Sequence, residues 1–330
     1  NPSVHPTTRS ERIEALDVMR GVALLGIFIM NMPGFSSSFF IPEAAVRAKM
    51  DEAGSLDSAI LLMNSALLEG KFNGLFTLLF GMGLALQIDR LQAMGGHHVV
   101  ARRLLVLLVF GLLHIGLLWA GDVLHIYAVL GVLLWAVRKW SAGPLLGLAA
   151  ALLLAQFAHG VLMARHWSLA EFEAEQAFLQ GLMTLDNAVY GSGAWWPGVL
   201  LRLQEAWWFY THEFLWAPTI WFWLALMTTA VLGLWVQRSG WLRTDSVRAQ
   251  WLTSSEGLIV LLVLMALALG LWWAGSQLTG EHDLSEAPTP GVMLGWMLGD
   301  THRVLLVLAY AGLILRWCLG SGAPALRRYL

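Results

Sequence analysis

Residues 102–131 read RRLLVLLVFGLLHIGLLWAGDVLHIYAVLG, two apolar runs separated by a short break at residues 120–122. Runs of this kind approach the length that an α-helix needs to cross about 30 Å of hydrocarbon, and a tight break between them predicts a membrane hairpin. The composition extends this prediction to the whole chain. With 58% hydrophobic and 13% charged residues among 330, the chain has too little polar surface to cover a soluble globule.

Eight apolar stretches are long enough to be read as spans: residues 17–34, 73–89, 103–120, 122–137, 143–164, 214–236, 257–275 and 291–316. Residues 57–70 are shorter and carry Asn64 and Glu69, so we expect a re-entrant or interfacial helix there. Residues 165–213 form the longest segment between spans, amphipathic and then aromatic. The sequence therefore predicts an all-α polytopic helical bundle, with residues 1–330 forming one transmembrane domain.

The distribution of arginine and lysine predicts the orientation. If the N-terminus is cytoplasmic, 13 of these residues lie in inner segments and five in outer ones, as the positive-inside rule requires. Both ends of the chain are then inside, and residues 165–213 are outside. Arg20 and Arg303 remain within or at the edge of spans, where a charge needs a partner or a watery cavity.

A dense aromatic tract marks the end of the outer segment. It could be an aromatic belt at the membrane interface, or a wall for a lipid or polyprenyl acceptor. Its members are Trp195, Trp196, Trp207, Trp208, Phe209, Tyr210, Phe214, Trp216, Trp221, Phe222 and Trp223.

Polar residues at the inner end of the first span form a stripe. Asp17 and Arg20 are three residues apart on one helical face, and Asn31 lies about three turns deeper. The pair could be a structural ion pair, or Arg20 could offer its guanidinium to a phosphate or carboxylate. In the second span, Asn73 is polar enough to line a cavity, and Gly81 and Gly83 predict the close approach of another backbone.

The opening hairpin carries the strongest candidates for chemistry. His114 lies eleven residues beyond Arg103, or about 16 Å along a helix, which predicts a position near the bilayer midplane. A neutral imidazole at that depth suits proton transfer, although an interhelical hydrogen bond would also explain it. Asp122 and His125 follow the turn. We predict that His114, Asp122 and His125 are the catalytic residues if the protein is an enzyme.

The last span contains Gly299, Asp300, His302 and Arg303. We expect the glycine and aspartate to break the helix, and Arg303 to pair with Asp122 across the bundle. The prediction is one polar cavity lined by Asp17, Asn31, Asn73, Asp300, His302 and Arg303 around the catalytic groups.

Several function classes lose their usual support. A net charge of −2 argues against a nucleic-acid partner, and a single cysteine, Cys318, allows no disulfide framework or cysteine-built metal site. The sequence contains neither a phosphate-binding glycine loop, an HExxH zinc motif nor a GxSxG elbow. We expect no metal and no tightly bound cofactor.

Three motifs nevertheless resemble the YeiB-like bacterial membrane proteins, a family named for its domain of unknown function 418. The first comprises Arg12, Leu16, Asp17, Arg20, Gly21, Ala23, Leu24, Leu25, Gly26 and Asn31. The second comprises Lys71, Phe72, Leu75, Phe76, Leu79, Phe80, Gly81, Gly83 and Arg90. The third comprises Arg102, Arg103, Leu104, Gly111, His114, Trp119, Gly121, Asp122, Tyr127, Ala128 and Gly131.

The resemblance implies a multi-pass protein of the bacterial inner membrane. Family members continue with further helix past the position of Leu330, so the native chain is expected to extend beyond it. The family is distantly similar to transmembrane acyltransferases, which include the lysosomal heparan glucosaminide acetyltransferases. Those enzymes use a histidine in the outer loop after the first helix, whereas residues 31–44 here contain none.

This relation implies an acyl-CoA donor whose phosphates would be held by Arg20, Arg90, Arg102 and Arg103. His114 or His125 would then act as general base on a lipid or glycan acceptor, with Asp122 or Asn31 orienting the base. Two other functions remain open. Ionisable groups near the midplane also suit a transporter or exporter, and the chain could be a structural membrane subunit.

Overall fold

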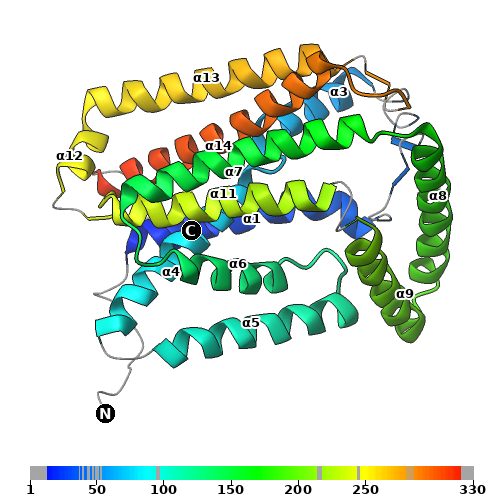
Figure 1. Cartoon of the computed structure of the whole chain (residues 1–330), viewed down its shortest axis with the longest axis horizontal. Coiled ribbons are helices and arrows are strands. Elements are labelled where there is room, and N and C mark those ends of the chain that lie inside the picture. The colour runs from blue at the N-terminus through cyan, green and yellow to red at the C-terminus, as the bar shows by residue number, and fades with distance from the viewer. Residues whose placement is uncertain are drawn as a thin grey trace.

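The computed structural model is a bundle of helices (Figure 1). The residues that it describes are 13–36, 38, 41–42, 45–46, 48, 52, 54–93, 97–213, 218–243, 246–280, 282–283 and 285–320. Every regular element among them is helical. This confirms the predicted all-α polytopic fold.

Seven helical stretches in the described part of the chain are long and apolar enough to cross a membrane. Six of them correspond to helices α1 (Glu14–Ser36), α5 (His97–Leu117), α7 (Ala142–Arg165), α11 (Pro218–Arg238), α13 (Ser255–Thr279) and α14 (Pro290–Leu319). The seventh is the stretch Ser55–Leu91, which includes most of α4 (Lys71–Ala93) and the helical residues before it. The predicted start of the sixth span, residues 214–217, lies outside the described residues. The protein is therefore a multi-pass membrane protein by the length and composition of its helices.

The predicted fourth span is shorter than expected. Helix α6 (Leu124–Ala136) has 13 residues, or about 20 Å, and alone falls short of the hydrocarbon thickness. Turns at residues 118–123 and 137–139 limit it at both ends. It still packs against α5 and returns the chain toward the other end of the bundle (Figure 1).

Residues 57–70 fold as two short helical pieces. The α-helix α3 (Ser55–Met63) continues into the π-helix η2 (Asn64–Leu68), and a turn at Glu69 and Gly70 leads into α4. Gly70 has φ +74°, a conformation that glycine adopts without strain. A re-entrant or interfacial position of this segment stays a prediction.

Helix α4 is the central element, packing against α1, α5, α6, α11 and α14. The contact with α11 is a backbone contact: a Cβ at Gly81 would lie 2.1 Å from the Ala230 carbonyl oxygen, and one at Gly233 2.2 Å from that of Leu78. The predicted close approach is thus confirmed at Gly81. Gly83 faces the Arg20 side chain instead.

The segment between the fifth and sixth predicted spans forms α8 (Leu169–Gly191), α9 (Trp195–Trp208) and the π-helix η3 (Phe209–Glu213). Helices α8 and α9 lie at the end of the bundle opposite the short helix α12 (Val247–Thr253) (Figure 1). Helix α14 is continuous for 30 residues, so the break predicted at Gly299 and Asp300 was wrong. Helical backbone bonding outweighs one glycine, whose cost is about 1 kcal/mol.

Candidate functional site

The α5–α6 hairpin brings the ends of two helices unusually close. A Cβ at Gly111 would lie 2.3 Å from the backbone nitrogen of His125 and 2.9 Å from Oδ2 of Asp122. Only a residue without a side chain fits there without a shift of backbone. The small residue on α5 therefore allows the first turn of α6 to pack beside it.

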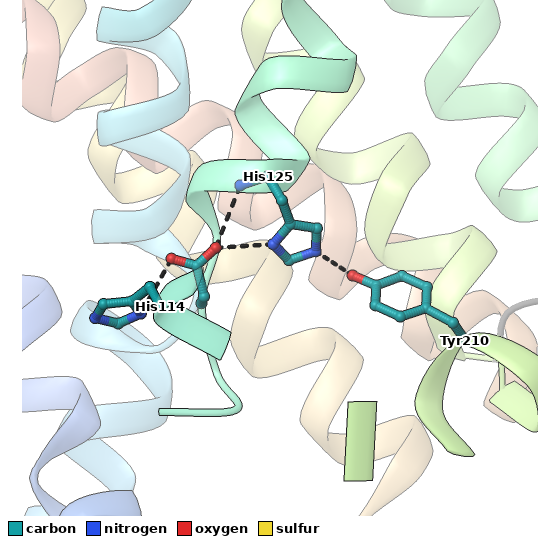
Figure 2. A network of polar contacts seen from close by, with 4 residues as sticks. His114, His125 and Tyr210 are labelled. Carbon is teal, nitrogen blue, oxygen red and sulfur yellow. Dashed lines mark hydrogen bonds and ion pairs between the residues drawn. The ribbon is translucent and has the colours of Figure 1, made fainter. Parts of the chain in front are cut away.

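Asp122 lies in the connection between the two helices, and its side chain is only 2% exposed. Its Oδ2 accepts hydrogen bonds from the backbone nitrogen of His125 at 3.2 Å and from the ring Nδ1 at 2.8 Å. Its Oδ1 lies 3.2 Å from Nδ1 of His114 (Figure 2). One buried carboxylate is thus shared by two imidazoles from different helices.

Tyr210, from η3, completes what we call the histidine–aspartate network: His114, Asp122, His125 and Tyr210 (Figure 2). Its hydroxyl is hydrogen-bonded to Nε2 of His125. Burial, and then the charge of Asp122, raise the pKa of Tyr210 to about 12. The hydroxyl is therefore protonated at neutral pH and donates to Nε2, so both ring nitrogens of His125 are engaged.

His114 lies on the other side of Asp122 from His125 (Figure 2). Its side chain is 34% exposed. Its Nδ1 is close enough to Asp122 for an ion pair, although the contact lacks the geometry of a hydrogen bond. The structure records no partner for its Nε2 among the described residues. Of the two histidines, His114 is the one that has a ring nitrogen available to a substrate.

A cavity of about 290 Å³ opens between α1, α4, α5 and α6. Tyr127 lies at its α6 side, two residues after His125, with its hydroxyl 3.0 Å from that of Thr77. The cavity combines two guanidinium groups and an amide with aromatic and aliphatic walls. Its lining includes Arg20, Phe76, Phe80, Gln87, Arg103, Leu104, Leu107, Leu124 and Tyr127.

Two of the four predicted phosphate-binding arginines line this cavity, namely Arg20 and Arg103. Arg102 is exposed beside Arg103, and Arg90 is half-buried without being part of the lining.

The pair predicted on α1 is present, with Arg20 Nη1 2.7 Å from Asp17 Oδ1. The half-buried Asn31 and Asn73 are not among the residues that line the cavity, and neither are His114, Asp122 and His125.

The predicted pairing of Asp122 with Arg303 was wrong. Arg303 forms an ion pair with Asp300 one helical turn away on α14, and its guanidinium lies 4.3 Å from the ring centroid of Trp221. Trp221 in turn donates from Nε1 to the other oxygen of Asp300 at 2.9 Å. We call Trp221, Asp300 and Arg303 the arginine centre. His302, also buried, hydrogen-bonds through Nδ1 with the Ala268 carbonyl on α13 at 2.8 Å.

Two residues important for the network were not expected from the sequence. Tyr210 was assigned only to the aromatic tract, of which Phe214 and Trp216 lie outside the described residues. Arg202 of α9 donates to the carbonyls of Gly116 and Leu117, at 3.0 and 3.2 Å, at the end of α5. Both act across more than 80 residues of sequence, so no local spacing signals them.

Comparison with curated proteins finds relatives of part of the chain. The uncharacterized protein YxaH of Bacillus subtilis (strain 168) is 36% identical over 156 residues, which are 46% of this chain and 39% of YxaH. An uncharacterized 39.9 kDa protein from the amylase 3′ region of Bacillus acidopullulyticus is 34% identical over 136 residues, 41% of this chain and 36% of that protein. The uncharacterized protein YeiB of Escherichia coli (strain K12) is 34% identical over 131 residues, 39% of this chain and 32% of YeiB.

The matched part thus covers about a third to two-fifths of the length of these relatives. No family model matches the chain, and no solved structure matches it. The predicted resemblance to the YeiB-like proteins is confirmed over the matched part. The names of the three relatives state no activity.

Proposed function

We propose that this relative of the YeiB-like membrane proteins is a transmembrane acyltransferase in which His114 is the general base. The observation that carries the proposal is the asymmetry of the network. A buried carboxylate lies beside Nδ1 of His114, while Nε2 has no recorded partner among the described residues. A carboxylate beside one imidazole nitrogen stabilises the imidazolium that forms when the other nitrogen takes a proton.

The proposed reaction moves an acyl group from a thioester to a hydroxyl or amine. Nε2 of His114 removes the proton of the acceptor hydroxyl or amine. At the same time the acceptor oxygen or nitrogen forms a bond with the carbonyl carbon of the thioester. The carbon–sulfur bond then breaks, and the leaving thiolate takes the proton back from the imidazolium. Asp122 orients the base, His125 holds Asp122, and Tyr210 holds His125.

The cavity beside α6 supports an anionic donor with an apolar arm. Arg20 and Arg103 supply two charges, and Phe76 and Phe80 supply aromatic walls. Its volume of about 290 Å³ is just below the usual range for ligand pockets, about 300–1,000 Å³. It suits the acyl and pantetheine part of acyl-CoA, with the nucleotide at the mouth near Arg102. The acceptor would be a lipid or glycan.

We place the protein in the bacterial inner membrane, with the start of α1 on the cytoplasmic side. The excess of arginine and lysine in the segments on that side supports this orientation. The donor cavity would then open toward the cytoplasm, and α8 and α9 would lie outside.

The second candidate function is transport. The arginine centre supports it, because ionisable residues buried in the middle of a long apolar helix are costly and often mark a substrate or ion path. The two functions differ in what each centre must do. A transporter would depend on Arg303 and Asp300, whereas the acyltransferase depends on His114.

The test compares purified wild type with His114→Gln and His114→Ala in proteoliposomes, using acetyl-CoA as donor probe and release of free thiol as readout. We expect both variants to fold and turnover to fall by about 10² or more, the range for loss of a general base. The matched control is His166→Gln, since His166 is exposed at the end of α7. Unchanged turnover in both His114 variants would remove the base and with it the proposal.

A further inference from the structure

Two buried carboxyl groups meet in the outer segment, outside the network described above. Asp186 of α8 and Glu205 of α9 are 0% and 2% exposed, and their side chains lie close enough for the charge of Asp186 to raise the pKa of Glu205. Two carboxylates in contact cannot share a hydrogen bond unless one carries a proton. Burial and the like charge of the neighbouring carboxyl both favour a pair that holds one proton.

The neighbours of the pair leave a place for this proton. The Ser38 hydroxyl donates to Oδ2 of Asp186, and the Tyr190 hydroxyl donates to Oε2 of Glu205 at 3.1 Å. Oδ1 of Asp186 is buried and has no donor if both groups are ionised. A proton on Glu205 supplies that donor and satisfies a buried atom that would otherwise be costly.

The other charged group that faces the pair does not neutralise it by contact. Arg202 lies on the same helix as Glu205, but its guanidinium donates to the carbonyls at the end of α5 and lies over the Trp195 and Tyr190 rings. Its positive charge lowers the pKa of Glu205 less than burial and Asp186 raise it, and the net result is a pKa of about 8. Burial likewise raises the pKa of Asp186, and that of Tyr190 is raised too.

The pair joins α8 to α9, and α9 holds the histidine–aspartate network at two points. Arg202 binds the carbonyls of Gly116 and Leu117, two and three residues after His114. The chain that leaves α9 brings Tyr210 to His125. A movement of α9 away from α8 would therefore act on both imidazoles.

We propose that Asp186 and Glu205 form a proton-binding site that holds the α8–α9 hairpin closed against the end of α5, and that loss of the shared proton opens the hairpin. The site goes beyond the proposed acyl transfer, because its closure can be measured without any substrate. On the predicted orientation it faces the outside of the cell, so the closed form would respond to external pH.

The direction of the response follows from the raised pKa. An open hairpin exposes both carboxyls and returns them to the ordinary range, near 4.5 for a glutamate. The closed form is then most favoured below that range, becomes less favoured as pH rises toward about 8, and is least favoured above it. Each unit of pH within this window changes the ratio of open to closed by about tenfold.

The experiment places nitroxide labels on two exposed positions, Leu105 of α5 and Gln204 of α9, after Cys318→Ser has removed the native thiol. Distances are measured by pulsed electron resonance in lipid nanodiscs from pH 5 to pH 9.5. We expect one short distance at pH 5 and a longer one whose share rises at least tenfold relative to the short one between pH 6 and pH 9.

In Glu205→Gln the side-chain amide can still accept from Tyr190 and donate to Asp186, but it cannot lose a proton between pH 5 and pH 9.5. The hairpin of this variant should therefore stay closed at every pH. Asp186→Asn is the second variant if Glu205→Gln fails to fold, and it should behave alike. Glu175→Gln, at an exposed position of α8, is the matched control and should respond as wild type does. A wild type without a pH-dependent distance, or a neutralised variant that keeps it, would overturn the proposal. Because no turnover is measured, either result leaves the test of His114 independent.

Discussion

The histidine–aspartate network and the arginine centre both contain a buried aspartate, but the two carboxylates are used differently. Asp300 is saturated, with Arg303 on one oxygen and the Trp221 indole on the other. Asp122 engages two histidines, one of which keeps a ring nitrogen without a recorded partner in the described part of the chain and is a third exposed. A buried carboxylate with a partner on each oxygen stabilises packing. A ring nitrogen without a partner can instead accept a proton from a substrate.

The arginine centre and the histidine–aspartate network also lie in different kinds of local structure. The arginine centre lies within α14 and α11, where backbone bonds are made inside each helix. The network lies at the connection between α5 and α6 and depends on η3 for its last member. An irregular connection can be reshaped by a ligand or by the outer hairpin more easily than the middle of two helices. The comparison makes the network the candidate reactive site and the arginine centre the candidate stabilising one.

The largest effect on stability should come from the arginine centre. Asp300→Ala leaves the Arg303 guanidinium without its partner, and we expect the free energy of unfolding to fall by about 3 kcal/mol, near the lower end for a broken buried ion pair because Arg303 is partly exposed. Unfolding by denaturing detergent in mixed micelles measures it. Asp300→Asn is the control and should lose less, since its amide oxygen can still accept from Trp221. An unchanged midpoint in Asp300→Ala would mean that this centre is not structural.

The next effect tests how the α5–α6 connection is packed. Gly111→Ala places a methyl group against the backbone of His125, so we expect a loss of about 1–3 kcal/mol, the usual cost of overpacking. Turnover should fall as well, because Asp122 must move. Gly147→Ala on α7 is the control: nothing lies within 4 Å of its added carbon, so its stability should hold or rise. If Gly111→Ala matches this control, the two helices approach less closely than described.

Tyr210→Phe should have a smaller effect. It removes one hydrogen bond to Nε2 of His125, worth about 1 kcal/mol net, and preserves the ring. Turnover should fall only a few-fold, because Tyr210 holds the network without touching His114. Thermal midpoint and thiol release measured on the same preparation separate the two effects. A loss of activity as large as that of His114→Gln would place Tyr210 at the reacting atoms instead.

The sequence predicted the positions of the long helices along the chain well, and the direction in which side chains face around each helix poorly. Hydropathy located the long spans, and the short break at residues 120–122 predicted that His114, Asp122 and His125 share one hairpin. The sequence did not show in which direction the Arg303 side chain points. Arg303 pairs with Asp300, one turn away on the same helix, and not with the distant Asp122. The length of α6 was overestimated because its apolar run includes residues that turn.

The outer segment shows a second limit. Asp186 and Glu205 are 19 positions apart, on different helices, and each alone looks like an ordinary surface acid of an amphipathic helix. Their burial depends on Ser38 and on the contact between α8 and α9, which no spacing reveals. Tertiary contacts between distant segments bring Asp186 and Glu205 together, and they likewise bring Tyr210 to His125.

The smallest expected change in stability is also the one that most sharpens the comparison. His114→Ala removes a side chain that is a third exposed and whose contact with Asp122 lacks hydrogen-bond geometry. We expect the free energy of unfolding to change by no more than about 0.5 kcal/mol, as for substitutions away from saturated buried groups. His125, held on both nitrogens, keeps Asp122 in place. Replacing a reactive residue should therefore leave the free energy of unfolding almost unchanged and yet lower thiol release by about 10² or more. If His114→Ala instead lost more than 1 kcal/mol, and His114→Gln restored both stability and turnover, His114 would be a packing residue like Arg303, and the difference between the two centres would disappear.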